Sequence, residues 1–479
     1  MAPPLGSPGV RIVTAGSPYQ VILRLATPTV LAMLTQSIVN EIDIYFFSLL
    51  PCPESSNAQA ALFPSLILLW AFGGSLSAIS VGTQAIAARR FAEGDREKAG
   101  GVLLNSWLFA TASSVVLTVL GYVTLPWVLE RLIAVPEVRE AAYDYLHWRL
   151  LGITSMVVTF SFKAFFDGIG KTHVHMVSAI IMNVLNILLC IAFIFGNWGA
   201  PRMGIAGAGL AGFASTWVGL FIMIGWAAFP TYRSIFRPFQ LKKTSLPVTK
   251  ELLRLSIPSG VATLAVMTGF GLFSFIVSKL DEITGAQTVS VGCPGGQAEP
   301  INGAATMVIV AVLKLTFTAC LAFGTSTATL VSQSLGEGDG DKAARFGWAS
   351  VRLGLVIFAV VGFLEGVVFP RQVLSIFTSS PAVLEAALLP MQVMGFCTPL
   401  IAVAMILTQA LFGAGNTRFV MIVELVLHFT CLVPLAWLLG VTLEFGLMGI
   451  WSAAVIYVVL LAAIMIYKFA RGDWRGIKI

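Results

Sequence analysis

Apolar segments long enough to cross a bilayer recur along almost the whole chain, and they constrain its fold more than any other feature. At about 1.5 Å rise per residue, a helix of about 20 residues spans the ~30 Å hydrocarbon core. Only 11% of the residues are charged, against about 25% in soluble domains. The sequence therefore predicts an all-α membrane protein with twelve transmembrane helices. Their expected ranges are 25–50, 60–88, 101–128, 146–166, 174–197, 204–229, 253–279, 302–334, 346–369, 386–412, 418–440 and 446–469.

Lysine and arginine give this predicted bundle a direction in the membrane. An even number of helices puts both termini on one side. Most of the 29 Lys and Arg residues stand in the tails and connections of that side, including the basic segment 232–250. Because positive residues collect on the cytoplasmic side, we expect a multi-pass protein of the inner (plasma) membrane with both termini cytoplasmic. The net charge of +6 therefore implies no nucleic-acid partner.

Two glycine-containing motifs occur once in each half of the chain. GTQAIAARRFAEGD (82–95) recurs as GTSTATLVSQSLGEGD (324–339), and DGIGKT (167–172) recurs as FGAGNT (412–417). The second copy also carries an extra polar loop, 281–302. Six helices per copy predict parallel repeats, that is, two pseudo-symmetric six-helix bundles. The expected division is a tail over 1–20, a lobe over 21–231, a linker over 232–250, a lobe over 251–470 and a tail over 471–479.

Two such lobes would enclose a cleft that rocking could expose to either face of the membrane. This favours a transporter over a channel, because no selectivity-filter loop is found. It also disfavours a receptor or a scaffold that transports nothing.

The first predicted helix carries acidic side chains at membrane depth. Gln36, Asn40 and Asp43 fall on one stripe of this helix, and Glu41 points the opposite way. An ionised aspartate in a spanning segment costs at least ~2.5 kcal/mol, so such residues usually mark an ion or substrate path. We therefore expect Asp43 to bind the coupling ion with Asn40 beside it, and Gln36 to line the cleft. The alternative is that Asp43 only hydrogen-bonds a neighbouring helix.

Further charged residues lie in the other predicted helices. Lys314 either lines the cleft or forms a fixed structural ion pair, because a lysine at that depth needs a partner. Glu424 and His428 share a helix face. They either extend a proton relay in the cleft or pack the interior. Lys163 and Glu365 lie near helix ends and are expected to snorkel.

The six cysteines show no metal-ligand spacing, and no metal is expected. Cys52 and Cys293 each precede a proline in an outer loop, where they form either a disulfide or two unpaired thiols. The other four are expected to be small hydrophobic residues inside helices: Cys190, Cys320, Cys397 and Cys431. The absence of a GxxxxGK[ST] loop argues against direct use of ATP. The sequence thus predicts a protein that is not an enzyme and has no cofactor other than a coupling ion, H⁺ or Na⁺.

The repeated motifs also resemble those of multidrug and toxic compound extrusion (MATE) transporters. The resemblance extends from about Arg24 to Tyr467 and includes GTQAIAARRFAEGDREKA, DGIGKT, NVLNILLCIAFIFGNWG, GIAGAGLA and QALFGAGNTR. It implies twelve helices in two bundles. It also implies an antiporter that exports organic cations or other amphipathic drugs and toxins by alternating access, in exchange for protons or sodium. The implied partners are a small amphipathic or cationic substrate and the lipid bilayer, and a monomer is expected.

The resemblance implies roles for particular residues. Asp43 matches an acidic residue in the outer half of the family's first helix. Pro28 matches a first-helix proline whose bending is thought to accompany protonation, although it could also be an ordinary tolerated kink. Asn186 matches an asparagine of the fifth helix, and Asn183 adds an amide one turn earlier. Cys190 stands where some members have an aspartate.

NorM-like members of the family carry a further acid in the seventh helix. Here that position is Val266, and the counterpart of Asp43 in the second copy is Phe273. The difference favours a DinF-like member and coupling to protons ahead of sodium. A flippase for lipid-linked or other amphipathic lipids, as in related members of the superfamily, is the alternative function.

Overall fold

The computed structural model describes residues 17–133, 135–285, 288–290, 298–378 and 380–479. Within these ranges, ten helices have the length and apolar composition to cross a membrane, and two bent helix pairs bring the spans to twelve. The predicted bundle of twelve transmembrane helices is therefore confirmed.

The N-terminal half supplies the first six spans. Its elements are α1 (Pro18–Ser48), α2 (Glu54–Phe72), η1 (Gly74–Ala78), α3 (Ile79–Ala92), α4 (Arg96–Leu132), α5 (Pro136–Leu151), α6 (Ile153–Gly168), α7 (Thr172–Phe195), η2 (Asn197–Gly199), α8 (Ile205–Ala228), α9 (Pro230–Phe236) and η3 (Leu241–Lys243). The chain bends by 47° between α2 and α3 and by 45° between α5 and α6, so each pair makes one broken span. The fourth span starts at Pro136, well before the predicted residue 146, because proline suits the first turn of a helix.

The C-terminal half supplies the other six spans. Its elements are α10 (Leu246–Thr284), β1 (Thr288–Ser290), β2 (Ala298–Pro300), α11 (Ile301–Gly336), α12 (Gly340–Phe363), η4 (Leu364–Val368), α13 (Pro370–Ser375), α14 (Pro381–Gly413), α15 (Thr417–Val426), η5 (Leu427–Leu432), α16 (Val433–Trp437), η6 (Leu438–Thr442), α17 (Gly446–Arg471) and η7 (Asp473–Gly476). The segments η4, η5 and η6 are π-helical turns. The predicted linker over 232–250 contains the end of α9, η3 and the first turn of α10.

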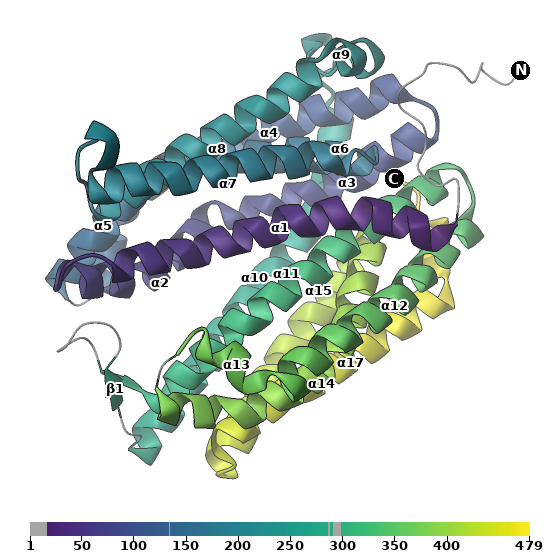
Figure 1. The fold of residues 1–479 in the computed structure, drawn as a ribbon. Helices are drawn as coiled ribbons and strands as arrows, with labels where there is room; N and C mark the ends of the chain where they lie inside the picture. The colour runs from purple at the N-terminus through teal and green to yellow at the C-terminus, as the bar shows by residue number, and fades with distance from the viewer. Residues whose placement is uncertain (1–16, 134, 286–287, 291–297, 379) are drawn as a thin grey trace, which may run out of the picture.

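Helix α1 lies between two groups of helices, one from each half of the chain (Figure 1). Near its start, Ile22 and Leu25 belong to a hydrophobic cluster with the C-terminal half. Near its other end, Phe46 and Phe47 belong to the cluster of the N-terminal half. Because α1 packs mainly on α7 and α11, it contacts both halves along its length.

The Gly-Asp pair of the first recurrent motif makes the same turn in both halves. Gly94 and Gly338 adopt left-handed φ angles of 87° and 78°, which favour glycine. The following Asp95 and Asp339 each accept the backbone N–H three residues later, at 3.0 and 2.7 Å, and so cap the next helix. Partial burial acts to raise the pKa of Asp95, but the hydrogen bonds from Lys98 outweigh burial and the pKa is lowered.

The insert of the second copy contains a short hairpin in the otherwise helical fold. β1 and β2 pair antiparallel, with Thr288 opposite Pro300. Buried Asp281 closes the base of the insert. It accepts the side-chain N–H of Asn302 at 2.8 Å and the backbone N–H of Gly303 at 2.9 Å.

The cysteines follow the sequence expectation where the structure describes them. Cys190, Cys320, Cys397 and Cys431 are free and buried. Cys52 is disulfide-bonded. Its suggested partner Cys293 lies outside the described residues, so the pairing stays a prediction.

Candidate functional site

Asp43 lies on the face of α1 that meets the N-terminal half. Its Oδ1 accepts from the thiol of Cys190 on α7 at 3.7 Å. The same sulfur lies 3.8 Å from Oδ1 of Asn186, and Asn186 donates to Oγ of Ser215 on α8 at 3.2 Å. The structure therefore brings Asp43 and Asn186 into one network, joined by a thiol that is a weak donor.

The other amides predicted for the ion site lie elsewhere along α1. Asn183 is buried and donates to Oγ1 of Thr35 at 3.1 Å, so it binds α1 at Thr35 rather than at Asp43. Gln36 is half-buried beside Thr35. The side chain of Asn40 lies outside the described part of the structure.

Arg149 is a member of this site that the sequence did not reveal. The sequence places it at an outer helix end, whereas α5 starts earlier and carries Arg149 into the N-terminal bundle. Its guanidinium lies 5.7 Å from the ring of Tyr145 and packs over Gly212 of α8, where a β-carbon would overlap it. It also interacts electrostatically with Asp43. The sequence analysis missed Arg149 because no sequence signal predicted the bend at Gly152, which joins α5 to α6 in one span.

Glu41 faces the other half of the molecule. It forms an ion pair with Lys314 of α11 at 2.5 Å, and both side chains are partly exposed. On the same side of α1, Ser37 donates to Oγ1 of Thr318 at 3.2 Å. The predicted opposite directions of Glu41 and Asp43 are therefore confirmed, and Lys314 has the acidic partner that its depth requires.

The predicted hinge residue Pro28 lies inside the continuous helix α1. Next to it, buried Thr29 donates to the carbonyl of Leu25 at 3.1 Å. The hydroxyl of Ser326 on α11 lies 3.5 Å from that of Thr29. Pro28 thus stands where α1 touches the C-terminal half.

Glu424 and His428 meet inside the C-terminal half. Both are buried, and Nδ1 of His428 lies 2.8 Å from the carbonyl oxygen of Glu424 and 3.4 Å from its Oε2. Tyr457 of α17 donates to Oε2 of Glu424 at 2.8 Å and was not predicted from the sequence. Gly269 of α10 lets the imidazole approach closely, since a β-carbon there would overlap it. The shared face predicted for Glu424 and His428 is confirmed by these contacts.

The recurrent motifs of the two halves contact one another at the predicted cytoplasmic end. Gln333 of α11 donates to the carbonyl of Gly168 at 2.7 Å. Arg89 of α3 is buried and donates to the carbonyl of Ala414 at 3.4 Å and to that of Ile477 at 2.6 Å. Each half therefore binds a glycine-rich turn of the other half through a side chain of its first recurrent motif.

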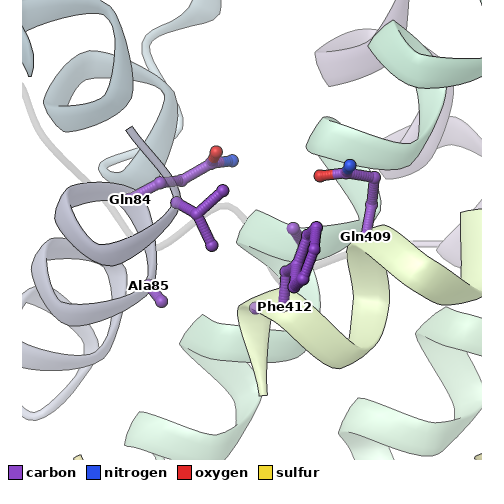
Figure 2. A pocket seen from close by; sticks show the side chains of 7 residues that line it. Gln84, Ala85, Gln409 and Phe412 are labelled. Atoms are coloured by element: carbon purple, nitrogen blue, oxygen red, sulfur yellow. The ribbon is translucent and has the colours of Figure 1, made fainter. Parts of the chain in front are cut away.

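The space left between the halves at this end is small. Gln84 of α3 donates to the carbonyl of Thr325 and to Oγ1 of Thr329, both at 2.8 Å. Figure 2 shows Gln84 on one side of a cavity and Gln409 and Phe412 of α14 on the other. The cavity has a volume of about 10 Å³, which admits about one water molecule. This end of the molecule is closed.

Lys163 does not snorkel as the sequence suggested. Its side chain is 12% exposed and forms an ion pair at 3.0 Å with Asp167, which is 2% exposed. The carbonyl of Asp167 accepts from Oγ1 of Thr329 in the C-terminal half. The expectation for Lys163 was wrong because α6 packs against α3 and carries this residue into the bundle.

A family model matches both halves of this architecture. The model MatE covers residues 28–192 and 299–438, one segment in each half. The chain belongs to the MATE family. Members of the MATE family are membrane transporters, so this chain is a multi-pass membrane transporter rather than an enzyme.

Relatives of this MATE protein include several named NorM. The probable multidrug resistance protein NorM of Thermotoga maritima is 27% identical over 464 residues, which cover 95% of this chain and 92% of that protein. The protein of the same name from Rhizobium meliloti is 24% identical over 473 residues, covering 95% and 93%. These names give no support to the expected likeness to DinF-like members. Nor do they support the flippase alternative.

Solved transporter structures have the same fold. An outward-facing multidrug resistance MATE transporter of the MOP superfamily has a TM-score of 0.85 at 20% identity, covering 99% of this chain and all of that chain. A MOP superfamily transporter from Pyrococcus furiosus has a TM-score of 0.83 at 20% identity, covering 97% and 98%. These similarities establish the two-lobe fold, and a fold alone does not determine a substrate.

Proposed function

We propose that this MATE transporter exports organic cations or other amphipathic drugs and toxins by alternating access, in exchange for protons rather than sodium. Asp43 is the coupling carboxylate. The observation that carries the proposal is the position of Asp43 on a spanning helix between the halves. There its carboxylate accepts a hydrogen bond from the thiol of Cys190 and interacts electrostatically with Arg149. The name multidrug resistance protein, borne by its relatives, supports the substrate class.

The coupling follows from the charge of Asp43. Deprotonated Asp43 attracts both Arg149 and a cationic substrate, and protonation removes that attraction. A proton that enters from outside therefore weakens substrate binding. By linkage, bound substrate weakens proton binding by the same factor. Asn186 joins α7 to α8 beside Cys190, and Asn183 joins α7 to α1 at Thr35. Asn40 takes part in ion binding with Asp43, as the sequence predicts.

The residues predicted for the cleft have parts in the same cycle. Lys314 and Glu41 form an ion pair between the halves that a cationic substrate displaces. Glu424 and His428 extend the proton path within the C-terminal half. Gln36 lines the cleft beside α1. The contacts of Arg89 and Gln333 separate when the predicted cytoplasmic end opens, and α1 bends at Pro28.

In this proposal the protein acts as a monomer in the plasma membrane, with both termini cytoplasmic. The moving units are the lobes 21–231 and 251–470, joined by the linker 232–250. At the predicted cytoplasmic end the two lobes are held together by the contacts of Arg89 and Gln333.

The proposal is tested with purified protein in liposomes, by following a fluorescent organic cation. A pH gradient and a sodium gradient are imposed separately. We expect the pH gradient to drive export, and Asp43→Asn to lower driven export to the level of empty liposomes. The substitution removes the charge and retains an acceptor oxygen, so thermal unfolding should report a folded protein.

Glu41→Gln is the matched control, because Glu41 lies two residues away and faces the other half. It should change the apparent affinity for the dye and retain the response to the pH gradient. Wild-type export by Asp43→Asn under the same gradient would exclude the coupling role. Export driven by sodium alone would exclude proton exchange.

A further inference from the structure

Residues 472–479, which we call the strap, follow the last spanning helix, and the transport cycle proposed above gives them no role of their own. Helix α17 ends at Arg471, and Gly472 adopts a left-handed φ of 74°, which favours glycine and ends the helix. The short helix η7 comes next. At Ile477 the backbone is extended, with φ −72° and ψ 122°. The strap therefore leaves the direction of α17 and runs along the predicted cytoplasmic end.

The first part of the strap is attached to the C-terminal half. Trp474 is fully buried, its indole N–H donates to the carbonyl of Phe469 at 2.9 Å, and the two rings stack at 4.6 Å. Arg475 forms an ion pair with Asp341 of α12 at 2.6 Å, and its side chain lies against Gly340. Because a buried tryptophan removes a large apolar area from water, this attachment is strong.

The end of the strap reaches the other half of the molecule. Successive side chains of an extended segment point to opposite sides. Accordingly, Ile477 and Ile479 are half-buried, and Lys478 between them is exposed. Ile477 packs against the hydrophobic cluster of the C-terminal half, and Ile479 packs against the cluster of the N-terminal half. The strap thus crosses from one half to the other.

The strap crosses the two halves at the place where Arg89 joins them. Arg89 of α3 donates both to the carbonyl of Ile477 at 2.6 Å and to the carbonyl of Ala414 at 3.4 Å. Next to Ala414, Gly415 has a φ of 87°, and a β-carbon there would lie 3.0 Å from Ile479 and 3.4 Å from Ile477. The strap therefore covers the glycine-rich turn between α14 and α15. Separation of the halves at this end would break the contacts of both Arg89 and Ile479.

We propose that the strap holds the predicted cytoplasmic end closed and must release the N-terminal half before this end opens. The proposal rests on the proposed function, since alternating access requires this end to open. Trp474 attaches the strap to the C-terminal half through a large buried ring, whereas Ile479 is only half-buried against the N-terminal half. Opening therefore detaches Ile479 and leaves Trp474 in place. The strap shifts the equilibrium between the closed and the open end towards the closed one.

The test uses the full-length protein in detergent and measures the rate at which N-ethylmaleimide labels Ala328→Cys. Ala328 lines the small cavity between the halves shown in Figure 2. The double variant Ile477→Ser/Ile479→Ser should raise this rate about fivefold to thirtyfold, because the two isoleucines bury apolar area only while the end is closed. Lys478→Ser is the matched control, since Lys478 lies between them and is exposed. Its rate should equal that of the protein carrying only Ala328→Cys.

The thiol of Cys320 is an internal reference in the same molecule, because it is fully buried within the C-terminal half. Mass spectrometry of peptides reads the two sites separately. Opening of the end labels Ala328→Cys alone, whereas unfolding labels both sites. Equal rates for the double variant and Lys478→Ser would overturn the proposal, and so would a parallel rise at Cys320.

Deletion of residues 477–479 is a second variant, and it retains the buried Trp474. It should raise the labelling rate at least as much as the double variant, and an unchanged rate would also overturn the proposal. The assay uses no substrate and no ion gradient. A negative result therefore leaves drug export by proton exchange to the liposome assay, and a failure of that assay leaves the role of the strap to this one.

Discussion

The two halves of the molecule are alike where they close against each other and different where they carry charge. At the closed end, Arg89 stands six residues before Asp95 and Gln333 six residues before Asp339. Arg89 and Gln333 each donate to a carbonyl in the glycine-rich turn of the other half. Closure by a pair of related lobes requires matching surfaces, so this part of the repeat is retained.

At membrane depth the resemblance between the halves ends. Asp43 of the N-terminal half corresponds to Phe273, whose ring packs 5.3 Å from that of Trp451. The C-terminal half carries its carboxylates at Glu365 and Glu424 instead. The repeat thus preserves the geometry of closure, while each half has its own buried chemistry.

The strongest test of this difference is Phe273→Asp, which places an aspartate in the C-terminal half at the position that corresponds to Asp43. Phe273 is 3% exposed and packs on the ring of Trp451, so an aspartate there would leave unfilled space and bury a charge. We expect the variant to lose at least about 4 kcal/mol of stability, as loss of aromatic packing and burial of a charge combine. Tm and the yield of folded protein in detergent measure the effect.

Phe273→Leu is the control and should lose much less. If Phe273→Asp were as stable as Phe273→Leu and restored proton-driven export to Asp43→Asn, the halves would be chemically interchangeable. The two halves would then not differ in their buried chemistry.

The next effect concerns the two related donors at the closed end. Arg89→Ala removes hydrogen bonds to two carbonyls and should favour opening by about 2 kcal/mol, or about 30-fold. Gln333→Ala removes one hydrogen bond and should favour opening by about 1 kcal/mol, or about fivefold. The measurement is the labelling rate of a cysteine at Ala328, which lines the small cavity in Figure 2.

Lys98→Ala is the control, since Lys98 forms an ion pair with Asp95 of its own half at 2.6 Å. Its labelling rate should equal that of the protein carrying only Ala328→Cys. Equal rates for Arg89→Ala and Lys98→Ala would show that the contacts between the halves do not hold this end closed.

The smallest effect is expected at the two helix caps, where the halves should behave alike. Asp95→Ala and Asp339→Ala should each cost about 1 kcal/mol of stability at pH 7. The pKa of Asp95 is lower in the folded state than its ordinary value of 3.8. Its contribution is therefore complete at neutral pH and is lost as the pH falls below that value.

Thermal unfolding at pH 7 and at acidic pH checks this expectation. Asp95→Asn keeps a cap acceptor without the charge, so it should unfold near the wild-type temperature. A stability gap between wild type and Asp95→Ala that stayed constant down to acidic pH would contradict the assigned role of the carboxylate. Unequal costs at Asp95 and Asp339 would weaken the symmetry of the closed end.

Some features of the site were predictable because they depend on local periodicity. Asp43 and Glu41 were expected on opposite faces of one helix, and their partners Cys190 and Lys314 lie on opposite sides of α1. Glu424 and His428 were expected to meet because residues four apart are neighbours on a helix. Tyr457 could not be predicted in the same way, since it comes from a different helix.

The amino-acid sequence by itself determined the twelve spans, the two related halves and the presence of an acid on each face of the first helix. Apolar length, motif recurrence and helical periodicity are all local properties of the chain. Only the tertiary structure decided which charges meet. Arg149 reaches the Asp43 site because a span bends at Gly152. Glu365 does not snorkel as expected but meets Thr316 and Thr398, because the π-helical turn η4 and three glycines bring α14 close. These bends and close approaches depend on packing between distant segments, and packing has no periodic signal in the sequence.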